Sequence, residues 1–510
     1  MKLRFLPVVP AMVLLLTASC RKLPNDPPKK PKPPTGIAAA KADTVYEFTA
    51  ATCDPDGDSV CMRVDWGNGD TSEWSNFTPS DSPVVFSHAW DSAGWFSIRT
   101  QARDVRGLNS EWSNPATVIV SGIHPLLWSR GSEDGDPCSP MVLTSGTDDL
   151  IYVGFCSDSV KVLSGDGTVR YAATSVDPSY NGEFITMPVY CPQTGHIIMG
   201  NDEGELYAFT QNLELAWHWP GNCNGEMFDD REWGMPAVYG NRIYVMHEDA
   251  DYMYGMVCCI LDLGDEALLV GAYTLPGDDE CFQPPVIDAD GNVLVQSDNG
   301  ILYKFSPDLD SMLLELYLGR QCTCYPPVIG GDGTIYWGSL DDWGLHALEP
   351  DGSEKWVADI DHPSLPVVGE SLLFLGTEDG DVVAVRAKSG YVKWRLTAGG
   401  PRSEFLSSPL LCSNGTLYIN DDYFLYCLNQ TDGLLLWTTE LPDWPARSGR
   451  GKEDESPASP SIAPNGDIIV PTYAWMSRVT GYPGTTLANA PWPKYQRDLF
   501  NTGCAAGPQP

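Results

Sequence analysis

One short pattern recurs eight times between Met141 and Ile462, and this recurrence constrains the fold more than any single residue does. Each copy opens on a proline that leads into an apolar strand. A glycine turn, a Tyr-rich strand, a second turn and further apolar strands follow. Successive copies begin 39 to 51 residues apart, and their opening residues are Pro140, Pro188, Pro236, Pro285, Pro327, Pro366, Pro409 and Pro460.

Asn-Gly and Asp-Gly pairs separate the expected strands, for example Asp290-Gly291, Asp332-Gly333 and Asn414-Gly415. Such pairs accept the positive φ that two-residue hairpin turns require. The segments between them are β-branched and aromatic, as strands prefer, and no long stretch after the N-terminus has helical periodicity. A period near forty residues with four short strands predicts an eight-bladed β-propeller over residues 122–490.

Charge and length narrow the classes of function. The chain has 510 residues and a formal net charge of −37, with an isoelectric point near 4.3. Binding to a phosphate backbone rests on clustered Lys and Arg, so we expect no nucleic-acid partner. The acidic residues are dispersed among the turns, which is typical of a solvated surface on a monomer or on a subunit of a complex.

The first twenty residues predict export. Lys2 and Arg4 precede an apolar stretch, and Thr17 to Cys20 form a small-residue cleavage site that ends in cysteine. This resembles a bacterial lipoprotein signal peptide with its lipobox, which implies cleavage before Cys20 and a lipid on its sulfur. The alternative is an ordinary secretory signal with an incidental cysteine.

The segment that follows is read as a linker, residues 21–35. The resemblance implies a bacterial cell-envelope location, and the basic Arg21 and Lys22 after the lipid cysteine favour the outer membrane. Residues 24–34 are rich in proline. They predict a stiff polyproline spacer that holds the folded part some ~30 Å from the bilayer.

Residues 36–121 lack the repeat and predict an immunoglobulin-like β-sandwich. Trp66-Gly67-Asn68-Gly69 and the segment from Gly94 to Asp104 resemble the PKD-type domain, with a fibronectin III-type sandwich as the alternative. Three alternating carboxylates are candidates for Ca²⁺ binding. An EF-hand loop would end in Glu and this one does not, so a capped turn is the favoured interpretation of Asp54, Asp56 and Asp58.

Fourteen cysteines besides Cys20 fit an oxidising compartment. Cys412 and Cys427 flank a strand-turn-strand unit, and Cys53 and Cys61 flank an acidic loop, so both pairs are possible disulfides. Buried free thiols on strands are the alternative for each of them.

The repeats resemble those of pyrroloquinoline-quinone (PQQ) propellers, whose blades end in an Ala-x-Asp-x-x-Thr-Gly-x-x-x-Trp motif. The matching copies include Ala384 to Trp394 and Leu428 to Trp437. We predict a packing role between blades for the blade tryptophans, and expect the strands at Tyr171, Leu268 and Leu313 to replace them in other blades. The blade tryptophans are Trp128, Trp217, Trp356, Trp394 and Trp437.

The two ends of the repeat predict how the ring closes. Leu126 to Trp128 form an isolated outer strand, and the unit after Pro460 lacks one, so their pairing would complete blade eight and remove an exposed edge. Residues 491–510 resemble the Trp-Pro-rich segment at the end of such propellers. We expect this tail to pack on the propeller rather than to add a blade.

The resemblance leaves two functions open. A PQQ-dependent dehydrogenase would use PQQ with Ca²⁺, and the adjacent Cys258-Cys259 resembles the eight-membered disulfide ring of such enzymes. The pair falls inside an expected strand, however, where neighbours point to opposite faces. We therefore favour a scaffold without catalysis or cofactor, similar to the propeller lipoprotein of the barrel-assembly machinery. It would bind envelope proteins or an extracellular ligand, and the membrane through its anchor.

Overall fold

Every regular element of the described chain is a β-strand. The computed structural model describes residues 25–505 except 37–38, 43, 92–93, 122–123, 132–139, 146–147, 155–158, 175–183, 185, 202–204, 221–235, 250–253, 277–282, 298, 318–325, 339–343, 362, 398–404, 422, 443–458, 473–474 and 499–500. This part contains no helix long and apolar enough to cross a membrane. The chain divides into two compact units, residues 1–121 and 122–510.

The first unit is a sandwich of a four-stranded and a two-stranded sheet, ordered β1-β6-β5-β3 and β2-β4. Its core is aromatic: Trp90 and Phe48 are almost fully buried, and the Trp90 indole donates to the carbonyl of Trp66 at 3.3 Å. The predicted immunoglobulin-like sandwich is therefore confirmed as an all-β unit. Its strands are β1 Ala39–Lys41, β2 Tyr46–Ala50, β3 Val60–Asp65, β4 Val84–His88, β5 Gly94–Asp104 and β6 Ala116–Ser121.

The proline-rich segment does not stand free over its described part, which corrects the prediction of a spacer there. Pro28, Pro31 and Pro34 are buried, while the residues between them are exposed. A polyproline helix has three residues per turn, so this spacing places one face of the segment on the sandwich. Two backbone contacts hold it, from Lys29 N to Cys53 O at 3.0 Å and between Thr35 and Thr49.

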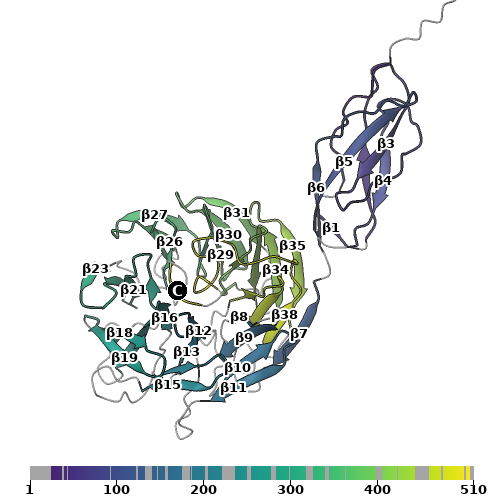
Figure 1. The fold of residues 1–510 in the computed structure, drawn as a ribbon. Coiled ribbons are helices and arrows are strands. Elements are labelled where there is room, and N and C mark those ends of the chain that lie inside the picture. The colour runs from purple at the N-terminus through teal and green to yellow at the C-terminus, as the bar shows by residue number, and fades with distance from the viewer. Residues whose placement is uncertain are drawn as a thin grey trace, which may run out of the picture. The chain divides into compact units, whose positions relative to one another are not determined.

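The second unit is a ring of eight four-stranded blades, as predicted (Figure 1). From inner to outer strand, they are blade 1, β8 Met141–Ser145, β9 Asp148–Gly154, β10 Ser159–Ser164, β11 Val169–Thr174; blade 2, β12 Val189–Cys191, β13 His196–Gly200, β14 Leu206–Phe209, β15 Leu215–Trp219; blade 3, β16 Pro236–Tyr239, β17 Arg242–Asp249, β18 Tyr254–Asp262, β19 Ala267–Thr274; blade 4, β20 Val286–Ile287, β21 Val293–Gln296, β22 Ile301–Phe305, β23 Met312–Tyr317; blade 5, β24 Val328–Ile329, β25 Ile335–Gly338, β26 Gly344–Leu348, β27 Glu354–Asp359; blade 6, β28 Val367–Val368, β29 Leu372–Gly376, β30 Asp381–Arg386, β31 Val392–Thr397; blade 7, β32 Leu410–Leu411, β33 Thr416–Asn420, β34 Phe424–Asn429, β35 Leu435–Glu440; and blade 8, β36 Ser461–Ile462, β37 Ile468–Thr472, β38 Trp475–Val479, β7 Leu126–Gly131.

Burial follows the position of a strand in its blade. Middle strands such as β25 and β33 are buried at every residue, whereas outer strands such as β19 and β23 alternate between half-buried and exposed. A middle strand lies between neighbouring blades on both faces, so it reads as a continuous apolar run. The core is thus a set of layers between blades.

The turns of the blades differ from the predicted two-residue type. Gly291 has a φ of 84°, but Asp290 before it is absent from the residues with positive φ. A type I′ turn needs positive φ at both central residues. Instead, Gly291 N donates to Asp288 O at 3.1 Å and Asp288 N to Asn292 O at 2.9 Å, which is the longer turn that ends in a left-handed glycine.

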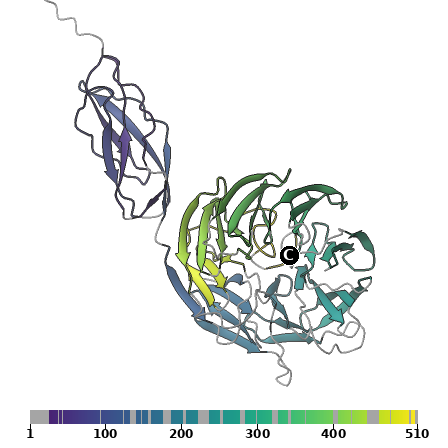
Figure 2. The ribbon, with the colours of Figure 1, turned by 180° about the vertical axis from the view of Figure 1, so that it is seen from behind.

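The ring closes as the sequence predicted. β7 pairs antiparallel with β38, so that Trp128 lies opposite Arg478 and Leu126 opposite Val479. The last blade therefore takes three strands from one end of the unit and the outer strand from the other. Figure 2 shows the same ring from behind, with β7 in blue beside the yellow strands of blade 8.

The tail lies inside one end of the ring. Its backbone bonds to the innermost strands of several blades: Val368 N donates to Trp492 O at 2.7 Å, Val238 N to Thr502 O at 2.9 Å and Ile287 N to Gly503 O at 2.9 Å. Trp492 is almost fully buried in the same cluster as Val328 of blade 5. The tail thus joins the inner strands of blades that are far apart in the sequence.

We predict that ring closure fails without β7. Deleting residues 1–121 should leave one cooperative unfolding transition for the propeller. Deleting residues 1–131 should lower its melting temperature by about 10 °C or more, because β38 loses its partner and the turn at Gly165 and Gly167 loses the Trp128 indole. Differential scanning calorimetry of the two truncated chains measures this, and equal melting curves would contradict the closure by β7.

Candidate functional site

One equivalent position on the outer strand of each blade faces the next blade in the ring. In every blade, the pairing between the third strand and the outer strand shifts its register once. The last pair before this shift contains an equivalent outer-strand residue in each blade. In five blades the paired outer-strand residue is one of the predicted tryptophans: Trp217 opposite Ala208, Trp356 opposite Ala347, Trp394 opposite Ala384, Trp437 opposite Cys427 and Trp128 opposite Arg478.

Three of these tryptophans, Trp128, Trp356 and Trp394, donate to a carbonyl in a turn of the following blade. The Trp356 indole donates to Ala387 O at 2.9 Å, and the Trp394 indole to Gln430 O at 3.1 Å. A Cβ on Gly390 would lie 2.7 Å from the Trp356 ring, and one on Gly433 would lie 2.6 Å from the Trp394 ring. The glycine in the turn therefore makes room for the indole, so the repeated tryptophan and glycine act as one interblade contact.

Blade 7 meets the closing blade differently, because blade 8 has no covalent turn between its outer two strands. His124, just before β7, stacks on Trp437 with ring centroids 3.9 Å apart. His124 Nδ1 also contacts Thr480 O at 2.7 Å. The imidazole thus takes the place that the turn glycine has in other blades, and burial lowers the pKa of His124.

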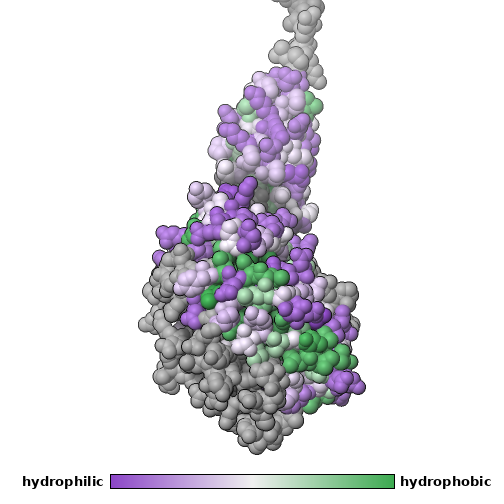
Figure 3. Space-filling view, turned by 90° about the vertical axis from the view of Figure 1, so that its left-hand side faces the viewer, coloured by the Kyte–Doolittle hydropathy of each residue, from purple (hydrophilic) through white to green (hydrophobic). Residues whose placement is uncertain are grey.

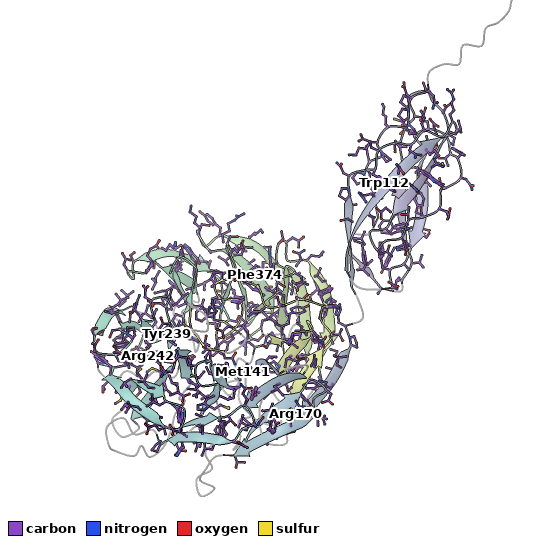
Figure 4. The ribbon with its side chains drawn as sticks, in the orientation of Figure 1. Trp112, Met141, Arg170, Tyr239, Arg242 and Phe374 are labelled. Atoms are coloured by element: carbon purple, nitrogen blue, oxygen red, sulfur yellow. The ribbon has the colours of Figure 1, made fainter. Side chains whose placement is uncertain are left out.

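The predicted strands replace the tryptophan in the other three blades, with Tyr171 at the shared position of blade 1. Gly271 and Leu314 occupy the shared position, whereas Leu268 and Leu313, one or more residues earlier, are exposed. Counting residues cannot locate the register irregularity that decides which side chain faces the next blade. An ion pair between Arg242 Nη1 and Asp308 Oδ1 at 2.8 Å joins blade 3 to blade 4, and Figure 4 labels Arg242 on this side of the ring.

Blade 2 meets blade 3 through a buried polar cluster that the sequence analysis missed. The Asp262 carboxylate accepts from the Trp217 indole at 2.9 Å and contacts His196 Nδ1 at 2.9 Å, and Thr194 Oγ1 donates to it as well. The nearby Cys191 thiol is buried, and burial raises its pKa. A buried thiol of raised pKa is a poor nucleophile, so the cluster is suited to joining blades rather than to catalysis.

A second buried polar cluster fixes the tail. Lys494 Nζ donates to the Tyr495 carbonyl at 2.9 Å, the Asp498 carbonyl at 3.1 Å and Asn501 Oδ1 at 2.6 Å. The Asn501 amide continues to the carbonyl of Pro188 in blade 2 at 3.0 Å. Burial lowers the pKa of Lys494 to about 7. This buried lysine thus organises the turn of the tail.

A cavity of about 360 Å³ lies beside the tail between blades 4 and 5, lined by Pro491, Ala505 and two glycine turns. Asp288, Asp290, Lys304 and Asp332 are its charged groups, and Asp288 pairs with Lys304 at 2.7 Å. This ion pair holds the pKa of Asp288 below its usual value despite the opposing effect of burial. No convergent acid, base and nucleophile line the described walls of the cavity.

The cysteines contradict three pairings considered from the sequence. Cys258 is disulfide-bonded, but Cys259 is a free thiol, so these neighbours on β18 do not form an eight-membered ring. Cys412 and Cys427 are both free and buried. Cys427 lies on β34, whereas Cys412 directly follows β32 on the other side of β33. Two strand spacings separate them by about 9–10 Å, whereas a disulfide needs Cα atoms within about 7 Å.

Cys53 and Cys61 are free as well. The loop before Cys61 is closed by a carboxylate instead of a disulfide, because Asp54 Oδ1 accepts from the backbone of Asp56 at 2.9 Å and of Asp58 at 3.2 Å. This is the capped turn that the sequence favoured. The structure also brings the three carboxylates together, with one oxygen of each within 4.8 Å of the others. Cys20 lies outside the described residues.

Two copies of Ser-Glu-Trp-Ser brace the sandwich, and the sequence analysis overlooked their repetition. Ser75 Oγ accepts from Met62 N and Ser113 Oγ from Thr100 N, both at 3.0 Å. Trp74 lies under the Arg63 guanidinium, 4.6 Å from the ring centroid, and under that of Arg103, at 4.2 Å. Trp112, labelled in Figure 4, lies 5.1 Å from Arg63. The repetition of Ser-Glu-Trp-Ser at 72–75 and 110–113 is the sequence signal that could have predicted these contacts.

Comparison with known proteins agrees with this geometry. A family model described as outer membrane protein assembly factor BamB matches residues 341–470. The curated relatives include outer membrane protein assembly factor BamB of Yersinia pestis, 33% identical over 19% of this chain and 23% of the relative. The BamB of Moranella endobia is 26% identical over 37% of this chain and 48% of the relative. The matches thus span less than half of each relative's length.

The propeller is PQQ-like and resembles BamB. The crystal structure of BamB from Moraxella catarrhalis superposes with a TM-score of 0.50 at 13% identity, over 70% of this chain and 98% of that one. A europium-containing methanol dehydrogenase gives a TM-score of 0.50 at 11% identity, over 75% and 91%. At these identities the PQQ-like propeller shares the fold with both.

The sandwich has a separate match. The PKD domain of an M14-like peptidase from Thermoplasmatales archaeon SCGC AB-540-F20 is 36% identical over 19% of this chain and 98% of that chain, with a TM-score of 0.18.

We predict that the glycine under an interblade indole tolerates no side chain. Gly390→Ala should destabilise the PQQ-like propeller by about 1–2 kcal/mol for its left-handed backbone, plus about 1–3 kcal/mol for crowding Trp356. Gly415→Ala is the matched control, since its φ of 83° is also left-handed but its Cβ would meet nothing within 4 Å. Chemical unfolding of both variants measures the difference, and equal losses would contradict the contact.

We predict a pH dependence from Lys494. Between pH 7 and 10.5 the unfolded chain keeps this lysine protonated while the folded chain releases the proton, so the stability of the wild type should rise with pH relative to Lys494→Met. Below pH 7 the difference should be constant, and the total rise should reach roughly 5 kcal/mol. Urea unfolding at several pH values tests this, with the exposed Lys388→Met as control. A flat difference would contradict the lowered pKa.

Proposed function

We propose that this chain is a lipid-anchored binding protein of the bacterial cell envelope, and that it holds a protein partner on the outer strands of its propeller without catalysis. The resemblance to BamB supports the location and the class of function, since those relatives are outer membrane protein assembly factors. The disulfide at Cys258 supports an oxidising compartment. The anchor would be the lipid on Cys20.

The observation that carries the proposal is the outer strand of blade 3. β19 has eight residues and is the longest of the outer strands. Its sequence, from Ala267 to Thr274, contains no charged residue, whereas most other outer strands carry at least one Lys, Arg, Asp or Glu. Soluble proteins protect such edges with charge because an open edge accepts another strand.

Apolar side chains are exposed along this edge. Leu268 is 50% exposed and Val270 39%, and on the neighbouring β23 Leu313 is 52% and Tyr317 71% exposed. Figure 3 faces the side of the molecule that carries these blades and shows apolar residues gathered there among polar ones. An extended segment of a partner that pairs with β19 would gain main-chain hydrogen bonds and bury these side chains.

The proposal does not include a quinone cofactor. The tail forms backbone hydrogen bonds with the innermost strands of several blades, and Cys259 is a free thiol. The likeness to a methanol dehydrogenase is one of fold. The absence of a cofactor is therefore part of the proposal and is tested with it.

We predict that partner capture depends on β19. Native complexes are extracted with detergent from membranes of cells that express the tagged wild type, the double variant Leu268→Lys and Val270→Lys, or the control Tyr391→Lys and Val392→Lys at the start of β31. The β19 variant should lose a wild-type partner at least tenfold, because two charges block strand addition, while the control retains it. Melting temperatures confirm that both variants are folded.

Three outcomes would contradict the proposal. Equal recovery of all partners by the β19 variant would remove β19 as the binding edge. Unchanged membrane partitioning and maturation of Cys20→Ser would remove the lipid anchor. Stoichiometric PQQ binding with Ca²⁺, accompanied by dye reduction with alcohols or sugars, would replace the scaffold by a dehydrogenase.

A further inference from the structure

The second strand of several blades carries a tyrosine whose hydroxyl reaches the following blade. Tyr152, Tyr244 and Tyr336 donate to a carbonyl in the turn between the third and outer strands of the next blade, at 2.9, 2.7 and 3.4 Å. The acceptors are the carbonyls of Gln211, Pro307 and Ala387. Phe374, labelled in Figure 4, has the same position in blade 6. An aromatic ring at this position is therefore a recurrent contact between blades.

Blade 4 departs from this pattern at two neighbouring positions. Leu294 occupies the position of the tyrosine, as the pairing with the innermost strand shows. On the third strand, Lys304 lies opposite Leu294, whereas Ala347 lies opposite Tyr336 in blade 5. Blade 4 thus has a leucine and a lysine where blade 5 has a tyrosine and an alanine.

The cavity between blades 4 and 5 lies at this altered boundary. Its volume is about 360 Å³, and Leu294, Lys304 and Pro350 are among its lining residues. Pro350 follows Ala347 by three residues, the same spacing that places Ala387 after the third-strand alanine of blade 6. It is therefore the carbonyl that a tyrosine of blade 4 would reach. None of the described side chains of blade 4 donates to it.

The walls of the cavity suit one ring. Leu294, Ile329 and Ile335 are at most 3% exposed and form an apolar floor, to which the tail adds Pro491. Pockets for small ligands start at about 300 Å³ and combine apolar walls with a few polar groups that fix the orientation of the ligand. Cavities with apolar walls take up flat rings such as benzene. The volume therefore favours a ligand with a single aromatic ring.

The polar groups of the cavity decide what this ring should carry. Lys304 Nζ contacts Asp288 Oδ2 at 2.7 Å, and an ammonium has three N–H groups, so it can also donate to a ligand. Asp290 and Asp332 line the cavity and are exposed, which places them at its mouth. Asp332 pairs with Lys355 at 3.2 Å. Three carboxylates and one ammonium line the cavity, so its charge favours a cationic ligand.

We propose that this cavity binds a small cationic phenol, whose ring takes the place of the tyrosine that blade 4 lacks. The hydroxyl would donate to the Pro350 carbonyl and accept from Lys304, and the amine would face Asp290. The ligand would then supply the contact between blades 4 and 5 that tyrosine supplies at other boundaries. This inference does not depend on the function proposed for β19.

A series of four probes tests the chemistry of the ligand. The full chain is titrated with tyramine, p-cresol, phenethylamine and 4-hydroxyphenylacetate by ligand-observed NMR. We expect tyramine to bind at least tenfold more tightly than phenethylamine, which lacks the hydroxyl, and than 4-hydroxyphenylacetate, which carries a negative charge. Absence of tyramine binding, or equal affinity for tyramine and either of these two probes, would overturn the proposal.

Two sources share this chemistry, a free aromatic amine and a tyrosine beside a lysine in a peptide. The blocked dipeptide acetyl-Tyr-Lys-amide separates them. Binding tighter than that of tyramine would support a peptide as the source, and weaker binding would support a free amine.

Two variants locate the site. The double variant Leu294→Tyr and Lys304→Ala installs the tyrosine–alanine pair of blade 5, so it should fill the cavity and abolish tyramine binding, with its melting temperature as the check of folding. Asp290→Asn changes only an exposed side chain and should weaken tyramine binding several-fold while leaving p-cresol binding unchanged. Asp265→Asn, an exposed carboxylate of blade 3, is the matched control and should bind both like the wild type. Unchanged tyramine affinity in Asp290→Asn or in the folded double variant would contradict this site.

Discussion

The propeller depends on one repeated contact, the indole of an outer strand placed on a glycine turn of the following blade. A blade by itself exposes an apolar face on each side, and only stacking against neighbours buries both. The indole adds a directed hydrogen bond to this burial, as between Trp394 and Gln430. The position of each blade relative to the next is therefore fixed at their shared boundary. Where the indole is missing, at Gly271, an ion pair across the same boundary takes over part of its role.

At two blade boundaries, polar side chains replace the contact that a turn of the next blade makes with the indole elsewhere. His124 replaces a turn glycine beneath Trp437 because blade 8 is made from both ends of the unit. Asp262 replaces a turn carbonyl beneath Trp217. Each such exception lies where the repeat is broken or degenerate. The buried polar clusters of this unit are thus understood as local solutions to one packing problem.

Sequence reasoning reached the fold because the period, the prolines and the turn glycines are local signals of a regular architecture. It also found the closing strand, since Trp128 stood apart from any other repeat unit. It named the strands at Leu268 and Leu313 but not the residue on each that faces the next blade, because the register irregularity depends on hydrogen bonding that residue spacing does not encode. It proposed Cys412 with Cys427 for a similar reason, as sequence neighbours across a hairpin can be separated by a whole strand.

The joining of both chain ends in blade 8 has a consequence for biosynthesis. β7 is made first and β38 last, with more than 300 residues between them, so their pairing has very high contact order and is slow to form. While a chain is still being synthesised, blade 8 is incomplete and the edge of β7 stays open. A chain cut short anywhere before Trp475 can never cover that edge. Ring closure therefore reports that synthesis is complete, and a protease or chaperone that recognises open edges could distinguish whole chains from fragments.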